Sequence, residues 1–456
     1  MPKFEKMNAT ETAPTQGIFS EKTFLAAKDA RGKNDVLAAG RDCSWSDFNA
    51  LPMPNRRMEE WRFATLSPFA PENFSLPSAD AVSAELAASL VARSNCVPNA
   101  AGTLVFADDR LVAASLAPEL AAQGVALAPL KALPPAIRMR VRQYFYLSGG
   151  GICSEKITSL HRAYADGGAY LLYVPAGVRV ARPVAVYHWN ATPSTATFPY
   201  AIVVAEENSS VAFANFFFSA EKTAAKASRN VPAKALVVSR LEIFAKPGAN
   251  VARKLIQDLA FDTQFYQQEW THVHGGASVR GIALNLGSQR ARTTTELRLE
   301  GSRARADLFS LTVADGEQEI DQRTMQRHTA PDAESTLLFK NVLLDRSRTI
   351  FGGSIVVAPA AQHTQASQSN RNLVLSPDAE SFSLPGLEID ANDVQCTHGA
   401  TNGTLDPEQL FYLRQRGISE SAARALLIQG FFEEIIGKIE SVELADVLRR
   451  ALAERV

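Results

Sequence analysis

The sequence from residue 168 to about residue 404 consists of short strand-like segments with no helical segment between them. Turn residues separate the segments at recurring intervals, for example at Pro247-Gly248-Ala249 and Pro331-Asp332-Ala333. A doubly wound α/β domain needs helices between its strands, whereas a solenoid grows by stacking coils. The chain is therefore predicted to be mostly β, with a β-helix (solenoid) over residues 168–404. Its strand candidates, which are rich in β-branched, aromatic and alternating residues, are Tyr170–Val174, Val184–Trp189, Ala201–Val204, Val211–Phe218, Ala235–Phe244, Ser278–Leu286, Thr293–Leu299, Ala306–Val313, Leu337–Leu343 and Ser354–Val357.

Helical sequence precedes this β region. Residues 18–167 are Ala-rich, with helix candidates at Ala81–Ala92 and Pro134–Leu147 and a short strand at Thr103–Ala107. We expect them to form an N-terminal, mostly helical domain. The polar residues 1–17 are predicted to be a disordered lead.

The C-terminal segment, residues 405–456, changes to a helical period. Asp406 and Ser419 are residues that cap helix N-termini, and Gly417 suits the end of the first helix. A third, short helix is expected from Ser441. Amphipathic helices at the end of a solenoid must bury their apolar faces. This C-terminal helical domain is therefore predicted to cover the last coil or to receive another subunit.

Charge and cysteine content limit the classes of function. A formal net charge of -1, without basic runs that carry aromatic residues, argues against nucleic-acid binding. No stretch approaches the roughly 20 apolar residues of a membrane span, and the polar N-terminus is unlike a secretory signal. We expect a cytoplasmic protein with reduced thiols, because no C-x-x-C pair or zinc spacing occurs among Cys43, Cys96, Cys153 and Cys396.

Cys396 and His398 are the candidate metal ligands. They lie two residues apart in a segment that alternates like a strand, so both side chains would leave the same face, roughly 7 Å apart along the chain. A thiol beside an imidazole suits soft-metal or sulfide chemistry. The alternative is a small buried thiol and a histidine bonded to a carbonyl group. His272 and His274 alternate in the same way, but no third ligand is evident nearby, which favours a solvated or core-satisfied pair.

Several segments together resemble a known protein family. Leu387–Thr401, which contains both candidate ligands, is similar to the signature of the SufB/SufD family, scaffold subunits of the iron–sulfur cluster assembly machinery. The chain is most like the SufD branch: it has Gly399 after His398, where the SufB branch usually carries Glu, and it lacks a cysteine cluster near the N-terminus. The other segments that fit the family pattern are Glu59–Phe63, Val174–Val178, Phe351–Ile355, Ala361–Thr364, Gln368, Asn372-Leu373, Leu410–Leu413 and Arg416–Ile418.

The resemblance implies a right-handed parallel β-helix between helical domains, in a complex with a SufB-type scaffold and two copies of a SufC-type ATPase. His398, with Cys396 as the second metal candidate, would contribute to a transient iron–sulfur cluster at the interface with SufB. The expected function is that of a non-catalytic scaffold, with no cofactor tightly bound in the isolated chain. Self-association into a homodimer stays open. The C-terminal helices would dock the ATPase, with the partner-binding candidates Leu410, Phe411, Tyr412, Leu413, Arg416 and Gly417.

Two alternatives remain at this point. A SufB-like scaffold could work as a homodimer without a separate SufB. A β-helix lyase or hydrolase of polysaccharides would use acidic residues to hold Ca²⁺, but the expected lack of a signal, the free thiols and the helical tail argue against it. Gly149-Gly150-Gly151 lacks the P-loop pattern, so ATP hydrolysis would come from a partner. We expect the candidate acidic residues of the β region to occupy solvated turns and solenoid faces. They are Asp258, Asp262, Glu269, Asp315, Glu317, Glu319 and Asp321.

Overall fold

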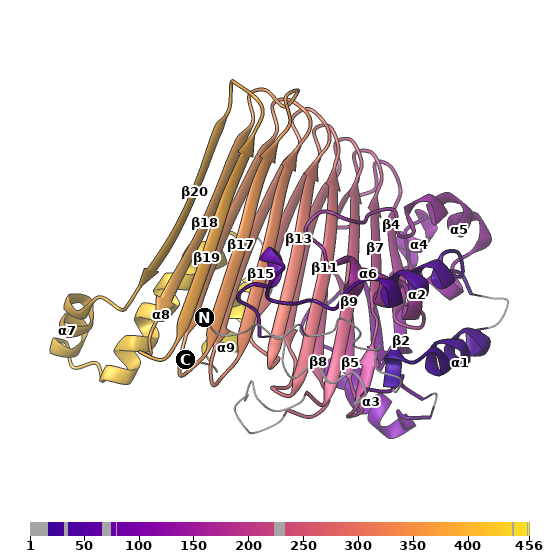
Figure 1. The fold of residues 1–456 in the computed structure, drawn as a ribbon, viewed down its shortest axis with the longest axis horizontal. Coiled ribbons are helices and arrows are strands. Elements are labelled where there is room, and N and C mark those ends of the chain that lie inside the picture. The colour runs from indigo at the N-terminus through magenta and orange to yellow at the C-terminus, as the bar shows by residue number, and fades with distance from the viewer. Residues whose placement is uncertain are drawn as a thin grey trace, which may run out of the picture.

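The computed structural model describes residues 17–31, 35–65, 74–78, 80–222, 233–439, 442–453 and 455, with the side chains of 442–444 left out. Apart from Gly17, the predicted disordered lead lies outside the described residues. Figure 1 shows a long stack of strands with helices gathered around its N-terminal end and further helices at its C-terminal end.

Two long sheets form the body of the protein, and we name each after its last strand. From β8 onward the chain alternates between the two sheets, adding one strand to each sheet per coil. The β20 sheet contains, in spatial order, β2 (Arg110–Leu116), β1 (Gly102–Ala107), β5 (Val184–Asn190), β8 (Ser210–Ser219), β10 (Asn250–Asp258), β12 (Ser278–Asn285), β14 (Arg305–Ala314), β16 (Glu334–Leu343), β18 (Gln365–Val374) and β20 (Gln395–Gly403). The β19 sheet contains β19 (Glu380–Ile389), β17 (Arg348–Val357), β15 (Glu319–His328), β13 (Arg290–Leu299), β11 (Thr263–Val273), β9 (Ala235–Ala245), β7 (Tyr200–Ala205), β4 (Ala169–Val174) and β3 (Ala126–Pro129), with β6 (Thr195–Thr197) paired to β9.

The predicted β-helix is confirmed. Neighbouring strands from β4 onward pair in parallel, and all the strand candidates lie within or largely within observed strands. Among the described strands, only β1 with β2 and β3 with β4 pair antiparallel. Side chains on the inner faces of the two sheets meet in a continuous apolar core that includes Val203, Leu241, Ile243 and Leu299.

A column of tight turns holds the coils in register along one edge of the stack. One residue in each of these turns has a positive φ, including Asn208 (56°), Gly248 (70°), Gly276 (65°) and Asp332 (59°). Their backbone N–H groups donate to carbonyl groups of the following coil, as from Gly248 to Gly275 at 3.0 Å. The left-handed conformation favours Gly, Asn and Asp, which explains the recurring turn residues.

The N-terminal region is mixed rather than purely helical, because β1, β2 and β3 extend the two sheets. The helix expected at Ala81–Ala92 is α3, and the one expected at Pro134–Leu147 is divided into α5 and η6. The domain boundary at residue 167 stays a prediction. The helical elements of this region are η1 (Gly17–Phe19), α1 (Glu21–Arg31), α2 (Arg41–Ala50), η3 (Glu59–Trp61), α3 (Ala84–Arg93), α4 (Pro118–Ala122), η5 (Leu130–Ala132), α5 (Pro135–Val141), η6 (Arg142–Tyr144) and α6 (Glu155–Tyr164).

A segment around η3 crosses the outer face of the β19 sheet, as Figure 1 shows. The Arg292 guanidinium lies 3.7 Å from the centre of the Trp61 ring, and Thr65 donates to the Glu319 carboxylate from its N–H at 2.8 Å and its hydroxyl at 2.6 Å. Phe63 stacks on Phe382 of β19 at 4.9 Å. The N-terminal region therefore contacts the last coil of the solenoid.

The C-terminal helices are α7 (Pro407–Gln415), α8 (Glu420–Ile436) and α9 (Val442–Ala453). As predicted, Asp406 caps α7 and Ser419 caps α8, each through a side chain that accepts a backbone N–H. Lys340 fixes α8 to the β20 sheet, because its ammonium group donates to the Phe431 carbonyl and lies 2.6 Å from the Glu434 carboxylate. Within the described residues, no helix combines the length and apolarity needed to cross a membrane.

The interpretation of all seven acidic residues as solvated was wrong for three of them. Glu269 lies inside the solenoid in an ion pair with Arg253, and Asp321 is buried between Arg292 and Arg323 at 2.6 Å from each. Glu319 is also buried. Arg292 and Arg348 lie beside Asp321 and Glu319 on neighbouring strands, and Arg253 reaches Glu269 from the opposite sheet. These basic partners offset the cost of burying the charges. Their carboxylates are therefore engaged in ion pairs and hydrogen bonds rather than arranged as an open Ca²⁺ site.

Asp109 at the tip of the β1–β2 hairpin provides a test of the fold. Its carboxylate accepts a hydrogen bond from the Phe198 N–H and touches Gly168, and burial raises its pKa from 3.8 to about 7. The folded state therefore keeps this proton to a higher pH than the unfolded state, so Asp109 lowers stability progressively as the pH rises from about 4 to about 7. A shift of this size corresponds to at most about 4 kcal/mol.

We expect Asp109→Asn, which keeps an acceptor oxygen without the charge, to be more stable than the wild type at pH 8. The gain should shrink as the pH falls toward 4. Thermal or urea unfolding of both proteins between these pH values measures it, and a constant difference across the range would contradict the assignment.

Candidate functional site

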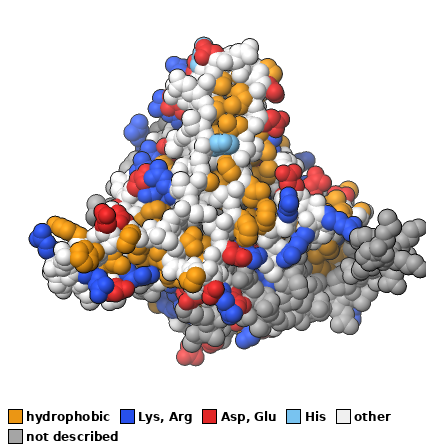
Figure 2. Space-filling model, turned by 60° about the vertical axis from the view of Figure 1, so that its left-hand side comes forward, with side chains coloured by type: hydrophobic (Ala, Val, Ile, Leu, Met, Phe, Trp, Pro, Cys, Tyr) orange, Lys and Arg blue, Asp and Glu red, His pale blue; other side chains and the backbone are white. Residues whose placement is uncertain are grey.

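The candidate site lies in the last coil of the solenoid, formed by β19 and β20. β19 pairs with β17 and β20 pairs with β18, and no described strand covers their other edges. Consequently Leu387 is 40 % exposed and Ile389 is 38 % exposed, although both occupy positions that face the interior in earlier coils. Figure 2 shows apolar side chains running as a stripe along this end of the molecule, with a histidine within the stripe.

Cys396 and His398 lie on one face of β20, as the spacing predicts. Their partners in the pairing with β18 are Ala366 and Gln368, both buried, so this face is the inner one. Cys396 is half-buried and packs against a small apolar cluster that includes Ile355. Burial raises the pKa of the Cys396 thiol, which disfavours the thiolate that binds metals.

His398 is exposed at the open end of the coil. No described residue forms a hydrogen bond or ion pair with its imidazole ring. A neutral imidazole offers one nitrogen as a metal ligand. Of the two predicted ligands, His398 is thus the accessible one and Cys396 the partly packed one.

Gln368 forms the floor beneath His398. Its amide nitrogen donates to the Gly353 carbonyl at 3.3 Å, and its amide oxygen is buried without a hydrogen-bond partner. A Cβ atom at Gly353 would lie 2.5 Å from this oxygen, so glycine is needed to make room for the glutamine. Both residues fit the family pattern in the sequence, but neither was predicted to have a role. The Gly352-Gly353 pair inside a strand is the physical signal, because it indicates a close approach.

The described residues of this chain do not complete a metal site. Within the part of the chain that the structure describes, no three His, Cys, Asp or Glu side chains are grouped so that they could hold a metal ion. Cys396 and His398 supply two ligands at the most, whereas an iron–sulfur cluster is commonly held by four. A cluster bound here would need further ligands from outside the described residues.

His272, the first member of the second histidine pair, is satisfied within the fold. His272 contacts the Ser148 hydroxyl through Nε2 at 2.7 Å and the Glu300 carboxylate through Nδ1 at 3.0 Å. Its ring also stacks on Phe244. These contacts agree with a core-satisfied role for His272.

The predicted partner-binding residues lie on and just after α7, which has no buried residues. Phe411 is 61 % exposed and Tyr412 is 56 % exposed, while Leu410 and Leu413 are half-buried. Arg416 donates to the Tyr412 hydroxyl at 3.1 Å, and Gly417 has the positive φ of 83° that ends the helix. The helix thus presents two aromatic side chains to solvent.

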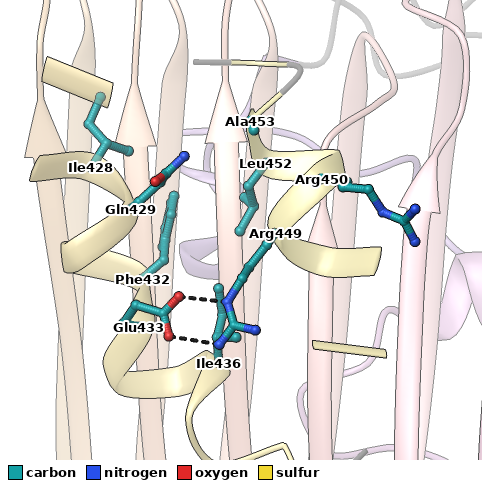
Figure 3. A pocket seen from close by; sticks show the side chains of 9 residues that line it. All are labelled: Ile428, Gln429, Phe432, Glu433, Ile436, Arg449, Arg450, Leu452 and Ala453. Carbon is teal, nitrogen blue, oxygen red and sulfur yellow. Dashed lines mark hydrogen bonds and ion pairs between the residues drawn. The ribbon is translucent and has the colours of Figure 1, made fainter. Parts of the chain in front are cut away.

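A separate hollow of about 250 Å³ lies between α8 and α9 (Figure 3). Apolar side chains such as Ile428, Phe432 and Leu452 line it, and a two-pronged ion pair between Glu433 and Arg449 bridges the helices. It contains none of the predicted site residues, and we interpret it as the packing contact between the last two helices.

Family models match almost the whole described chain. Residues 187–431 match the model described as SUF system FeS cluster assembly, SufBD core domain, and residues 20–186 match the SufBD protein N-terminal region. The first match covers the solenoid from β5 onward, together with α7 and most of α8.

Curated relatives agree with these matches. The chain is 29 % identical to the iron–sulfur cluster assembly protein SufD of Bacillus subtilis over 88 % of this chain and 90 % of that protein. It is 27 % identical to an iron–sulfur cluster assembly SufBD family protein of Synechocystis, over 99 % of this chain and 97 % of the relative. A 34 % identical match to SufD of Escherichia coli covers 38 % of this chain and 40 % of the relative.

The packing of Gly353 against Gln368 generates a prediction about stability. We expect Gly353→Ala to lower the free energy of unfolding by about 1–3 kcal/mol, because the added methyl group must displace the Gln368 amide. Gly399→Ala is the matched control, since nothing lies within 4 Å of a Cβ atom at that position. Urea unfolding of both variants measures the difference, and equal midpoints would contradict this packing.

Proposed function

The chain belongs to the SufBD family, and from this premise we propose that it is a SufD-type scaffold subunit of the SUF iron–sulfur cluster assembly system. In this proposal it catalyses no reaction itself and pairs with a SufB-type scaffold through the open end of its solenoid. The nascent cluster is cargo held transiently between the two proteins, and the isolated chain binds no cofactor tightly. A SufC-type ATPase docks on the C-terminal helices.

The observation that carries the proposal is an exposed histidine on an uncovered edge strand. No described strand pairs with the outer edge of β20, and an unpaired edge is the arrangement that accepts a strand from another protein. Leu387 and Ile389 expose apolar surface beside it. A partner that covers this edge would bring its own side chains to His398 and supply the ligands that this chain lacks.

We assign His398 and Cys396 different roles. The His398 imidazole is accessible and can bind iron as a neutral ligand. Because burial raises the pKa of Cys396, its thiol is the weaker candidate and mainly fills the apolar cluster beneath the strand. His398 is therefore the residue that this chain contributes to the cluster.

The ATPase site proposed on α7 is connected directly to the strand of His398. β20 ends at Gly403 and α7 begins at Pro407, so only three residues join them. A linker of that length spans about 10 Å at most. Lys340 fixes α8 on the β20 sheet, so a displacement of α7 is expected to pull on β20 and not on the whole helical domain. Movement driven by ATP could thereby open the contact at His398.

We expect His398→Ala to reduce iron–sulfur cluster formation by the assembled complex at least about tenfold, because a ligand is removed while the strand is unchanged. Cluster formation is followed by its visible absorbance and by iron content. Thr397→Ala, an exposed position on the opposite face of β20, is the control. Full cluster formation by His398→Ala would show that this residue is not a ligand.

We also expect the double variant Phe411→Ala/Tyr412→Ala to weaken binding of the SufC-type ATPase about tenfold or more, since exposed aromatic side chains are common centres of binding energy. Met139→Ala, at a residue of α5 that is 78 % exposed, is the matched control for the loss of a surface apolar group. Calorimetry with the full-length chain measures both. Unchanged affinity of the double variant would place the ATPase elsewhere.

A further inference from the structure

The open end of the solenoid carries acidic side chains and no Lys or Arg. The segment 376–403 covers β19, β20 and the turn between them, and it contains neither Lys nor Arg. All of its carboxylates belong to residues exposed to solvent. They are Asp378, Glu380, Glu388, Asp390 and Asp393.

Most of this charge is uncompensated. Glu380 pairs with Arg348 on the neighbouring strand, and the Asp393 carboxylate lies 3.3 Å from Nε2 of His363. Asp378, Glu388 and Asp390 form no ion pair with any basic side chain in the described part of the chain.

The rest of the β19 sheet shows the opposite arrangement. Along one row of its outer face the strand register aligns Arg290, Glu319, Arg348 and Glu380, so the sign of the charge alternates from each strand to the next. Opposite charges on directly paired positions stabilise a sheet. The row ends with Glu380 at the edge, where the next strand would continue the alternation with a basic residue.

We propose that this acidic end selects a partner scaffold whose docking edge carries Lys or Arg, and that it opposes docking of a second copy of this chain. The inference rests on the proposed function, because it assigns the specificity of the same surface. The uncharged edge of β20 and the exposed Leu387 and Ile389 supply contacts that do not discriminate between partners. The carboxylates determine which partner binds.

Self-docking would bring like charges together. If β19 paired antiparallel with β19 of a second copy about Leu384, Glu380 would lie opposite Glu388 on both sides of the symmetry axis. Any arrangement that joins two of these ends places two sets of carboxylates in one interface, with no Lys or Arg from either copy of the segment. A basic partner edge removes this repulsion and gains opposite-charge pairs.

The test uses the double variant Glu388→Gln/Asp390→Asn of the whole chain, which removes two charges that have no basic partner among the described residues and leaves side chains of the same size. Asp80→Asn/Glu207→Gln is the matched control, because both residues are exposed and neither belongs to the open end of the solenoid. Sedimentation measures self-association, and calorimetry measures binding of the purified SufB-type scaffold from the same genome. Both are done at about 0.05 M and about 0.5 M NaCl, which screen charges weakly and strongly.

We expect the double variant to self-associate about tenfold more tightly than the wild type at low salt and to bind the scaffold about tenfold more weakly. At high salt we expect the variant and the wild type to have the same affinities in both measurements. The control should behave as the wild type at both salt concentrations.

Equal self-association and equal scaffold binding of the variant and the wild type at low salt would overturn the inference. If the scaffold binds all three proteins alike, the charge selection is wrong and the proposed pairing stands. If the scaffold binds none of them, the proposed function fails, and self-association still decides whether these carboxylates oppose a second copy.

Discussion

A stack of parallel strands has no closing step of its own, and this constraint governs the whole structure. Each coil satisfies the backbone of the coil before it and leaves its own outer edge unsatisfied. At the N-terminal end β2 and β3 pair antiparallel with the first strands and become the edge strands of the two sheets, and α3 packs beside β1 and β2. At the C-terminal end β19 and β20 remain open. The two ends of the stack therefore differ, and the C-terminal end is the surface proposed to receive the partner scaffold.

The buried amide side chains inside the solenoid show the same dependence of each coil on its neighbour. Asn341 donates to the side chains of Asn370 and Asn372 at 3.0 and 2.8 Å, and Asn372 donates to Asn402 on β20 at 2.9 Å. Each buried amide depends on a neighbour within its own coil or in the next one, so the ladder is satisfied only where another coil follows. At the last coil this succession stops, and the inner row of β20, with Cys396 and His398, lies at the edge of solvent.

The length of strand-only sequence and the recurring turns were sufficient to predict the β-helix, since both follow from local patterns. Two strands missing from the prediction, β15 and β18, have inner faces rich in Gln, Thr and Asn, such as Gln322, Gln326 and Asn370. These residues replace the aliphatic side chains that mark a buried strand, and they are tolerated because neighbouring coils provide hydrogen bonds. Spacing alone placed Cys396 and His398 on one face. It could not reveal the contact of Gln368 with Gly353, which depends on how two sheets meet.

A scaffold that assembles a cluster must also release it, which argues for dividing the ligands between two chains. A complete four-ligand site within one rigid solenoid would hold the cluster tightly, because its geometry could not change without unfolding the coils. In the proposed pairing His398 lies on an edge strand, so separation of the two proteins would remove ligands from the cluster without disturbing either core. The short connection from β20 to α7 places this edge within reach of a force applied to the helical tail. The exposed carboxylates at the open end suit such a reversible contact. Charges of this kind act mainly on partner choice and on the rate of association, and they add little to the lifetime of the complex.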